Sequence, residues 1–200
     1  QLRIAQSVSL LGGGAILILG LIGIFLYEDV RQLQRLLDHN EQVLIPTIRQ
    51  GYEARINTIQ VQQWLTDISA TRGLDGLDDG FHEADVARTG FGQNLQLLKE
   101  LNPENRNFYE NIGPVFDAYH RMGKTMAQGY IDGGPAEGNR LMAQFDQSSA
   151  AINTQIAEVH QRIATLAEND FRQGHATIRE HIRILLLSFA VMAAGFVLLI

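Results

Sequence analysis

The chain has 200 residues, with 16 Lys and Arg against 22 Asp and Glu, and a formal net charge of −6. This mildly acidic balance lacks the basic surface by which proteins bind DNA or RNA, so we expect no nucleic-acid partner. The absence of cysteine excludes disulfides, thiolate metal sites, covalently attached c-type haem and cysteine nucleophiles.

An uncharged stretch covers residues 4–27. About 20 apolar residues in a helix cross a hydrocarbon core of about 30 Å. A cleaved signal peptide is the competing interpretation, but its apolar region is only about 7–15 residues long and ends at a small-residue cleavage site. Residues 4–27 exceed that length and run directly into Glu28 and Asp29, so we predict an uncleaved transmembrane helix.

Three turn-forming clusters divide residues 28–183 into four segments. The clusters lie at residues 72–80, at Asn102 with Pro103, and at residues 132–135. In each segment the apolar residues recur at spacings of three and four, which indicates helices, and no useful length alternates with the period of two expected for strands. The predicted helices are residues 28–71, 81–101, 103–131 and 135–183.

A second uncharged stretch covers residues 184–200 and follows Arg183 directly. The sequence stops while it is still apolar, so we expect more chain to follow. Arg3 precedes the first span and two acidic residues follow it, which places the N-terminus in the cytoplasm. Residues 28–183 would then be periplasmic in a bacterium, with both spans in the inner membrane.

The lengths of the predicted helices define the expected architecture. Segments 28–71 and 135–183 are longer than the two between them, so they would be the outer helices that lead to the membrane. The sequence therefore predicts an all-α fold: a membrane-anchored antiparallel four-helix bundle with two long outer helices continuous with two transmembrane helices. Pro46 and Pro114 lie inside predicted helices, and each should kink its helix because it removes a backbone donor.

Three stretches resemble sequences found in many bacterial methyl-accepting chemotaxis proteins. They are VQQWLTDISATRG at residues 61–73, YHRMGKTMAQGY at residues 119–130 and GNRLMAQFD at residues 138–146. The resemblance implies the periplasmic four-helix sensor region of a transmembrane chemoreceptor, which passes a helix displacement to a cytoplasmic signalling module. It also implies that a HAMP linker and a signalling hairpin follow residue 200.

The chemistry-bearing motifs are few. The sequence has no Gly-rich phosphate loop after a strand, no G-x-S-x-G and no H-E-x-x-H, so we expect no enzymatic activity. Neither His120 nor His160 follows a Glu by three residues, as a di-iron bundle requires. His39 and His175 are the only histidines expected at similar heights, and they remain weak metal candidates because a solvated role is favoured for both. We therefore expect no cofactor.

The candidate ligand site lies at the end of the bundle farthest from the membrane. Chain direction places the end of the first helix, the end of the third and the start of the fourth at this height. The residues expected there are Trp64, Asp67, Arg72, Lys124, Tyr130, Asn139 and Arg140. Because arginine binds carboxylates in a forked geometry, we predict a small anionic ligand. The alternatives are surface ion pairs for the charges and plain core packing for the aromatic residues.

Two functions from different classes follow from these observations. The leading one is a signal receptor that binds a small ligand or a periplasmic partner protein. The other is a membrane-anchored structural or cofactor-holding subunit, with haem or metal, of a larger complex. An apolar seam left exposed on the long helices would suit a homodimer in either case.

Overall fold

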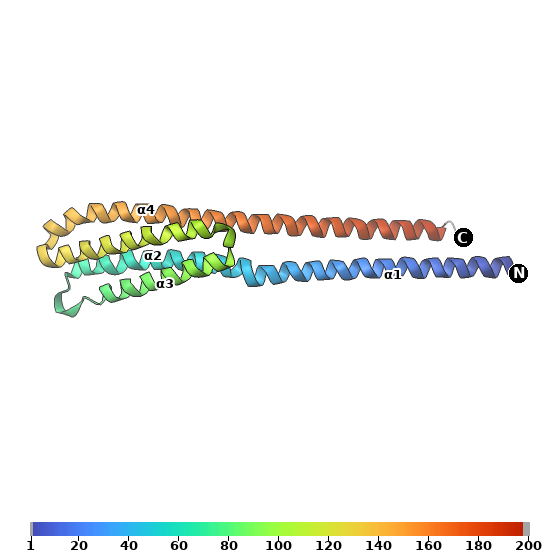
Figure 1. Ribbon diagram of the computed structural model, residues 1–200, viewed down its shortest axis with the longest axis horizontal. Helices are drawn as coiled ribbons and strands as arrows, with labels where there is room; N and C mark the ends of the chain where they lie inside the picture. The colour runs from blue at the N-terminus through green and yellow to red at the C-terminus, as the bar shows by residue number, and fades with distance from the viewer. Residues whose placement is uncertain (1, 198–200) are drawn as a thin grey trace. The chain divides into compact units, whose positions relative to one another are not determined.

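The computed structural model describes residues 2–197, which form helices joined by short turns and contain no strand. The long helices are α1 (Leu2–His39), α2 (Ile45–Thr71), α3 (Gly80–Leu101) and α4 (Arg106–Val197) (Figure 1). A π-helix (η1, Asn40–Leu44) precedes α2, and two 3-10 turns (η2, Leu74–Gly76; η3, Pro103–Asn105) flank α3. The predicted all-α class is confirmed.

The described chain divides into two compact units. One, here called the paired-helix unit, is formed by the described residues of Gln1–Asn40 and Glu168–Ile200. The other, here called the core unit, is Glu41–Ala167. The boundaries of the units therefore fall inside the predicted segments 28–71 and 135–183.

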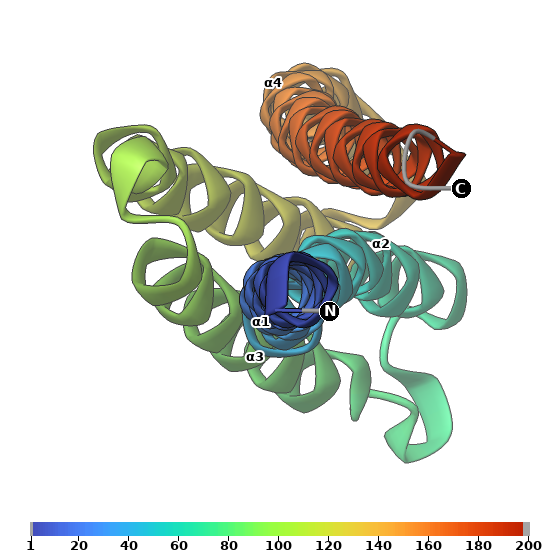
Figure 2. The ribbon, with the colours of Figure 1, turned by 90° about the vertical axis from the view of Figure 1, so that its right-hand side faces the viewer.

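The hydrophobic core cluster of the core unit is formed by α2, α3 and two separate parts of α4. Phe91 of α3 stacks on Phe116 of α4 with ring centroids 3.7 Å apart, and Tyr119 stacks on Phe145, further along α4, at 5.2 Å. The Tyr119 hydroxyl donates a hydrogen bond of 3.0 Å to the Thr58 carbonyl of α2. Figure 2 shows the green-to-yellow part of α4 and its orange part as two separate rods.

The two parts of α4 meet at Gly134. Its φ of 63° and ψ of −160° define a conformation that is essentially restricted to glycine. Across this turn the buried Tyr130 hydroxyl is hydrogen-bonded to the Asn139 side chain. Gly138 lies so close to the Tyr130 ring that a Cβ at this position would overlap it. The predicted turn at residues 132–135 thus contains the single described residue of α4 with non-helical φ and ψ.

An amide chain fixes α3 against α2. Asn94 is 8% exposed and accepts a hydrogen bond of 2.8 Å from Asn57. Its own amide donates to Gln50 at 2.8 Å. Gly90 lies directly against the Asn57 side chain, so a larger residue at that position would push the amide away. Because buried polar groups are costly without partners, this chain favours one alignment of the two helices.

The two prolines differ in their effect on the backbone. Pro46 has no N–H to bond the carbonyl four residues earlier, and the π-helix Asn40–Leu44 ends two residues before it. The buried Thr47 hydroxyl donates to the Val43 carbonyl at 2.7 Å and satisfies an acceptor in the disturbed turn. At Pro114 the φ and ψ angles stay helical, so the backbone does not break there.

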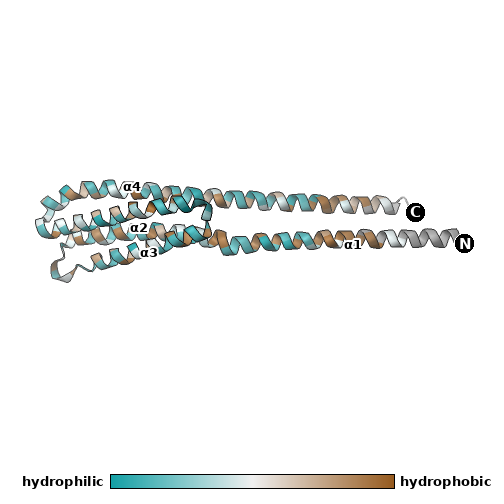
Figure 3. Ribbon diagram, in the orientation of Figure 1, coloured by the Kyte–Doolittle hydropathy of each residue, from teal (hydrophilic) through white to brown (hydrophobic). Residues whose placement is uncertain are grey.

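One helical run in the described residues, beginning at Gly12, is long and apolar enough to cross a membrane, and its most apolar stretch contains no buried residue. Figure 3 shows hydrophobic residues gathered along parts of α1 and near the end of α4. Residues 184–197 are the described portion of the predicted second span and carry no charge. Residues 198–200 of that span lie outside the described residues.

We expect Gly138→Ala to lower the free energy of unfolding by about 1–3 kcal/mol, because the added methyl group must displace the Tyr130 ring. Denaturant unfolding of the detergent-solubilised chain, followed by far-UV circular dichroism, measures this change. Gly92→Ala on the exposed side of α3 is the matched control, since nothing lies within 4 Å of its added Cβ. The control should be neutral or gain about 0.5–1 kcal/mol. Equal losses in the two variants would contradict the tight turn.

Candidate functional site

The turn after α2 places Arg72 at the edge of the core unit. Arg72 has a left-handed conformation with φ of 54°, and its N–H donates to the Ile68 carbonyl at 2.7 Å. Its side chain is exposed. The next residue, Gly73, packs against the Ile131 side chain of α4. The residue after Arg72 therefore lies beside α4 close to its turn at residues 132–135.

Arg140, just after the α4 turn, forms an ion pair with an acidic residue of the same helix. It donates two hydrogen bonds to the Glu137 carboxylate, at 2.6 and 2.9 Å, one turn earlier on the same helix. This hydrogen bonding, with the attraction of the two charges, lowers the pKa of Glu137 and raises that of Arg140. Both side chains are exposed. A ligand carboxylate at Arg140 would have to displace Glu137.

Lys124 is also paired. Its ammonium lies 2.9 Å from one carboxylate oxygen of Asp85 on α3 and 5.8 Å from the centre of the Phe81 ring. Burial alone would raise the pKa of Asp85, but the hydrogen bond and charge of Lys124, together with His120, outweigh it, so this pKa lies below its ordinary value. The other Asp85 oxygen lies 2.9 Å from Nε2 of His120. One carboxylate thus faces two cationic or potentially cationic groups.

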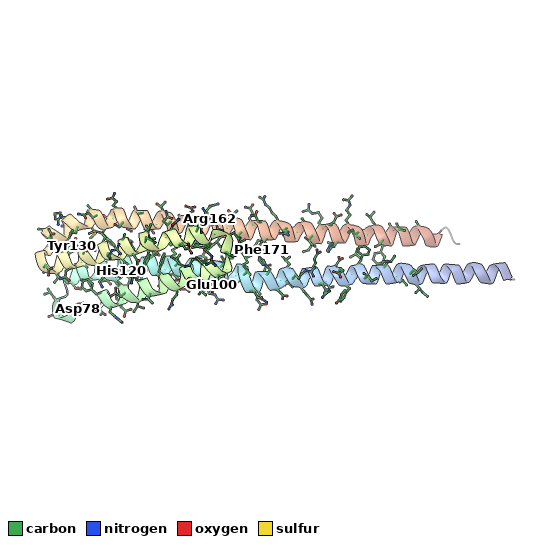
Figure 4. All side chains as sticks on the ribbon, in the orientation of Figure 1. Asp78, Glu100, His120, Tyr130, Arg162 and Phe171 are labelled. Carbon is green, nitrogen blue, oxygen red and sulfur yellow. The ribbon has the colours of Figure 1, made fainter. Side chains whose placement is uncertain are left out.

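His120 lies almost wholly inside the core unit, with 5% of its surface exposed. Figure 4 shows it between Tyr130, at one end of the unit, and Arg162, at the other. Burial lowers the pKa of His120; the Asp85 charge opposes this effect, and the charges of Lys124 and Arg88 add to it. The contact with Asp85 is short but is not aligned as a hydrogen bond. Burial thus favours the neutral form of the imidazole over the charged form.

A hollow of about 650 Å³ adjoins this cluster. Its lining residues come from α3 and α4: Phe81, Lys124, Thr125, Gln128, Gly129, Asp132 and Glu137. Of the predicted ligand-binding residues it contains only Lys124, whereas Asp132 and Glu137 contribute carboxylates. The hollow is therefore not lined by a group of unpaired basic side chains that could bind an anion directly.

Two predicted residues of α2 have other surroundings. Trp64 is half-buried and packs against the hydrophobic core, which matches its alternative interpretation. Asp67 is exposed. Among the described hydrogen bonds, none joins either residue to Tyr130, Asn139 or another predicted site residue. The structure thus gathers Tyr130, Asn139 and Arg140 at one turn, with Lys124 in the adjoining hollow.

Sequence reasoning missed two contacts in the paired-helix unit. Nε2 of His39 on α1 lies 3.1 Å from Oδ2 of Asp170 on α4. Nδ1 of His181 on α4 lies 2.9 Å from Oδ1 of Asp29 on α1. Each helix carries an aspartate followed by a histidine, ten residues later in α1 and eleven in α4. This similar spacing of aspartate and histidine in the two helices could have predicted the contacts. When two helices pack antiparallel, the aspartate of each lies opposite the histidine of the other.

The weak metal candidates, His39 and His175, do not form a pair. His39 contacts Asp170, and His175, five residues further along α4, lies on a different side of the helix and is exposed. In the part of the chain that the structure describes, no group of three or more His, Asp and Glu residues is placed to hold a metal ion.

In comparisons with known proteins, no family model, curated protein or solved structure matches the chain.

We expect the core unit to lose stability as the pH falls below about 6.5, the pKa of histidine in an unfolded chain. Burial lowers the pKa of His120 and of His160, and the Arg55 charge adds to the effect at His160. The folded state therefore binds fewer protons than the unfolded state between the folded pKa and 6.5, and stability rises with pH across that window. Unfolding titrations at pH values on both sides of it measure the loss.

His120→Gln should reduce this pH dependence, because it removes one buried imidazole. His82→Gln is the matched control, since His82 is exposed on α3. If both variants keep the full pH dependence of the parent chain, burial of His120 is not its source.

Proposed function

We propose that the chain is the sensory part of a transmembrane signal receptor, of the kind used in bacterial chemotaxis. The continuity of α4 is the observation that carries this proposal. Residues 135–197 contain no break in helical φ and ψ. This stretch begins with core residues such as Leu141 and Phe145 and ends in the uncharged residues 184–197. A packed helix of this kind passes a displacement at one end to the other.

In this proposal the core unit works as an antiparallel four-helix bundle of α2, α3 and the two parts of α4. The contacts between Phe91 and Phe116 and between Tyr119 and Phe145 support this arrangement. The apolar length of α1 supports membrane anchoring. Both spans would lie in a bacterial inner membrane, with the N-terminus cytoplasmic and residues 28–183 periplasmic. We assign the chain no enzymatic activity and no cofactor.

The ligand would bind where the α2 and α4 turns meet, and we retain a small organic acid or amino acid as its class. Arg140 and Lys124 are both paired with carboxylates there. Binding would therefore be an exchange of partners, in which the ligand carboxylate replaces Glu137 or Asp85. Release of Glu137 would change the first turn of α4 after Gly134, at the start of its continuous stretch. This exchange supplies a link between binding and displacement.

A homodimer is part of the proposal. α2 presents an apolar stripe to solvent, formed by Ile45, Tyr52, Ile56 and Ile59. Three of these residues are seven apart, which is the spacing of a coiled-coil seam. Tyr52 and Ile59 are each more than half exposed. Because polar residues flank the stripe, a second copy of α2 is its most suitable partner.

We expect an anionic ligand to raise the melting temperature of the detergent-solubilised chain in a screen of organic acids and amino acids. A ligand at a hundred times its dissociation constant adds about 2.7 kcal/mol, which a melting scan resolves. Arg72→Ala, Lys124→Ala and Arg140→Ala should each reduce or abolish the shift. Arg172→Ala is the control, because Arg172 also pairs with a carboxylate on the exposed surface of α4. If all three variants respond like the parent, the anion site is wrong.

We expect Ile59→Glu to raise the dimer dissociation constant about tenfold or more, because dimerisation would then bury an unpaired carboxylate. Analytical ultracentrifugation in detergent measures this constant. Val86→Glu on α3 is the matched control, since Val86 is about as exposed as Ile59 and lies outside the stripe. A monomeric parent chain at all concentrations, or equal effects of the two variants, would refute the α2 seam.

A further inference from the structure

Three contacts in the paired-helix unit belong to one antiparallel register. Asp29 of α1 meets His181 of α4, and ten residues further along α1 His39 meets Asp170. Between them the Leu36 side chain packs against the buried Gly174. Leu36 lies seven residues after Asp29, and Gly174 lies seven residues before His181. The three contacts therefore share one alignment.

The two polar contacts are partly shielded from water. The aspartate side chains are 22% and 17% exposed and the histidine side chains 26% and 43%. They line a hollow of about 440 Å³ between α1 and α4, together with Gln32, Arg35, Gln173 and Thr177. Shielding of this kind makes each contact stronger than a fully exposed surface ion pair.

We propose that the two Asp–His pairs form a register lock, which holds α4 in one longitudinal position against α1. The lock deepens the proposed function, on which its signalling role rests, because there a displacement of α4 carries the signal. A slide by one helical turn moves the partners about 5.4 Å apart. Both pairs would then break together, since both bridge the same two helices.

Arg35 provides a second position for the lock. It lies one turn before His39 on α1 and lines the same hollow. When α4 slides by one turn towards the N-terminal end of α1, Asp170 leaves His39 and comes level with Arg35. In the same movement His181 comes level with Phe25, which offers no carboxylate. A slide in the opposite direction brings His181 level with Leu33 and Asp170 level with Val43. The two Asp–His pairs therefore favour one resting position of α4 along α1. Arg35 favours a slide of α4 towards the N-terminal end of α1 over a slide in the opposite direction.

Disulfide formation between introduced cysteines tests the lock in membranes without ligand, because the chain has no cysteine of its own. Leu36→Cys with Gly174→Cys reports the resting register, since Leu36 packs against Gly174. Gln32→Cys with Gly174→Cys reports the register displaced by one turn. In the otherwise unchanged chain the first pair should cross-link faster than the second under a mild oxidant.

Adding His39→Gln and His181→Gln to both reporters should lower the ratio of the two rates about fourfold, about twofold for each lost pair. The exchange of His39→Asp with Asp170→His should leave the ratio at the parent value, without the twofold loss expected for one broken pair, because it rebuilds the pair with its members reversed. His175→Gln with Asp38→Asn is the matched control, since these residues of the same two helices are exposed. Far-UV circular dichroism checks that every variant remains folded.

An unchanged ratio in the double histidine variant would overturn the lock, as would an exchange variant that behaves like the broken pair. These outcomes leave the receptor proposal standing, because that proposal is tested separately by ligand-induced stabilisation. A ratio that falls as expected, in a chain that binds no ligand in the screen, would establish the lock and refute the anion site.

Discussion

At Gly134 the helical φ and ψ of α4 are interrupted by a backbone conformation that glycine adopts at little cost and other residues do not. The core of the core unit depends on this interruption, because Tyr119 before it stacks on Phe145 after it. A helix that continued straight through residue 134 would place these rings far apart. Gly138 adds a second requirement, since only a residue without a side chain lets the Tyr130 ring close over the turn. One turn therefore determines which aromatic side chains find partners.

Charge pairing near that turn limits what the site can do without rearrangement. Arg140 and Lys124 each have a carboxylate within hydrogen-bond distance, so an anion could bind either side chain only by displacing that carboxylate. An ion pair on the surface contributes little to stability, and for the same reason it is exchanged at little cost. His120 differs, because its burial makes protonation unfavourable and couples any change at Asp85 to the interior. In the proposed site, binding of an anion would therefore be an exchange of partners at Arg140 or Lys124.

The positions of the helices follow from apolar spacing and from Gly and Pro clusters, which are local properties of the sequence. The end of α2 at Thr71 and the break at Gly134 lie where such residues gather. Partner choice could not be derived in the same way. Glu137 and Asp85 take up the predicted ligand-binding cations, and Asp170 rather than His175 faces His39. These choices depend on helix register and rotation, which a count of 1.5 Å per residue does not resolve. The π-helix before Pro46 is a similar case, since the sequence predicts a disturbance but not its form.

The unbroken stretch of α4 after Gly134 also constrains how this chain can change in length. Each residue added to an α-helix turns everything beyond it by about 100°. One insertion between Asp170 and His181, both of which contact α1, would therefore leave only one of the two facing α1 even if every side chain were kept. An insertion of seven residues would nearly restore the angular phase, although it would move the two ends about 10 Å further apart. For this part of α4, the number of residues is a stricter requirement than the identity of most of them.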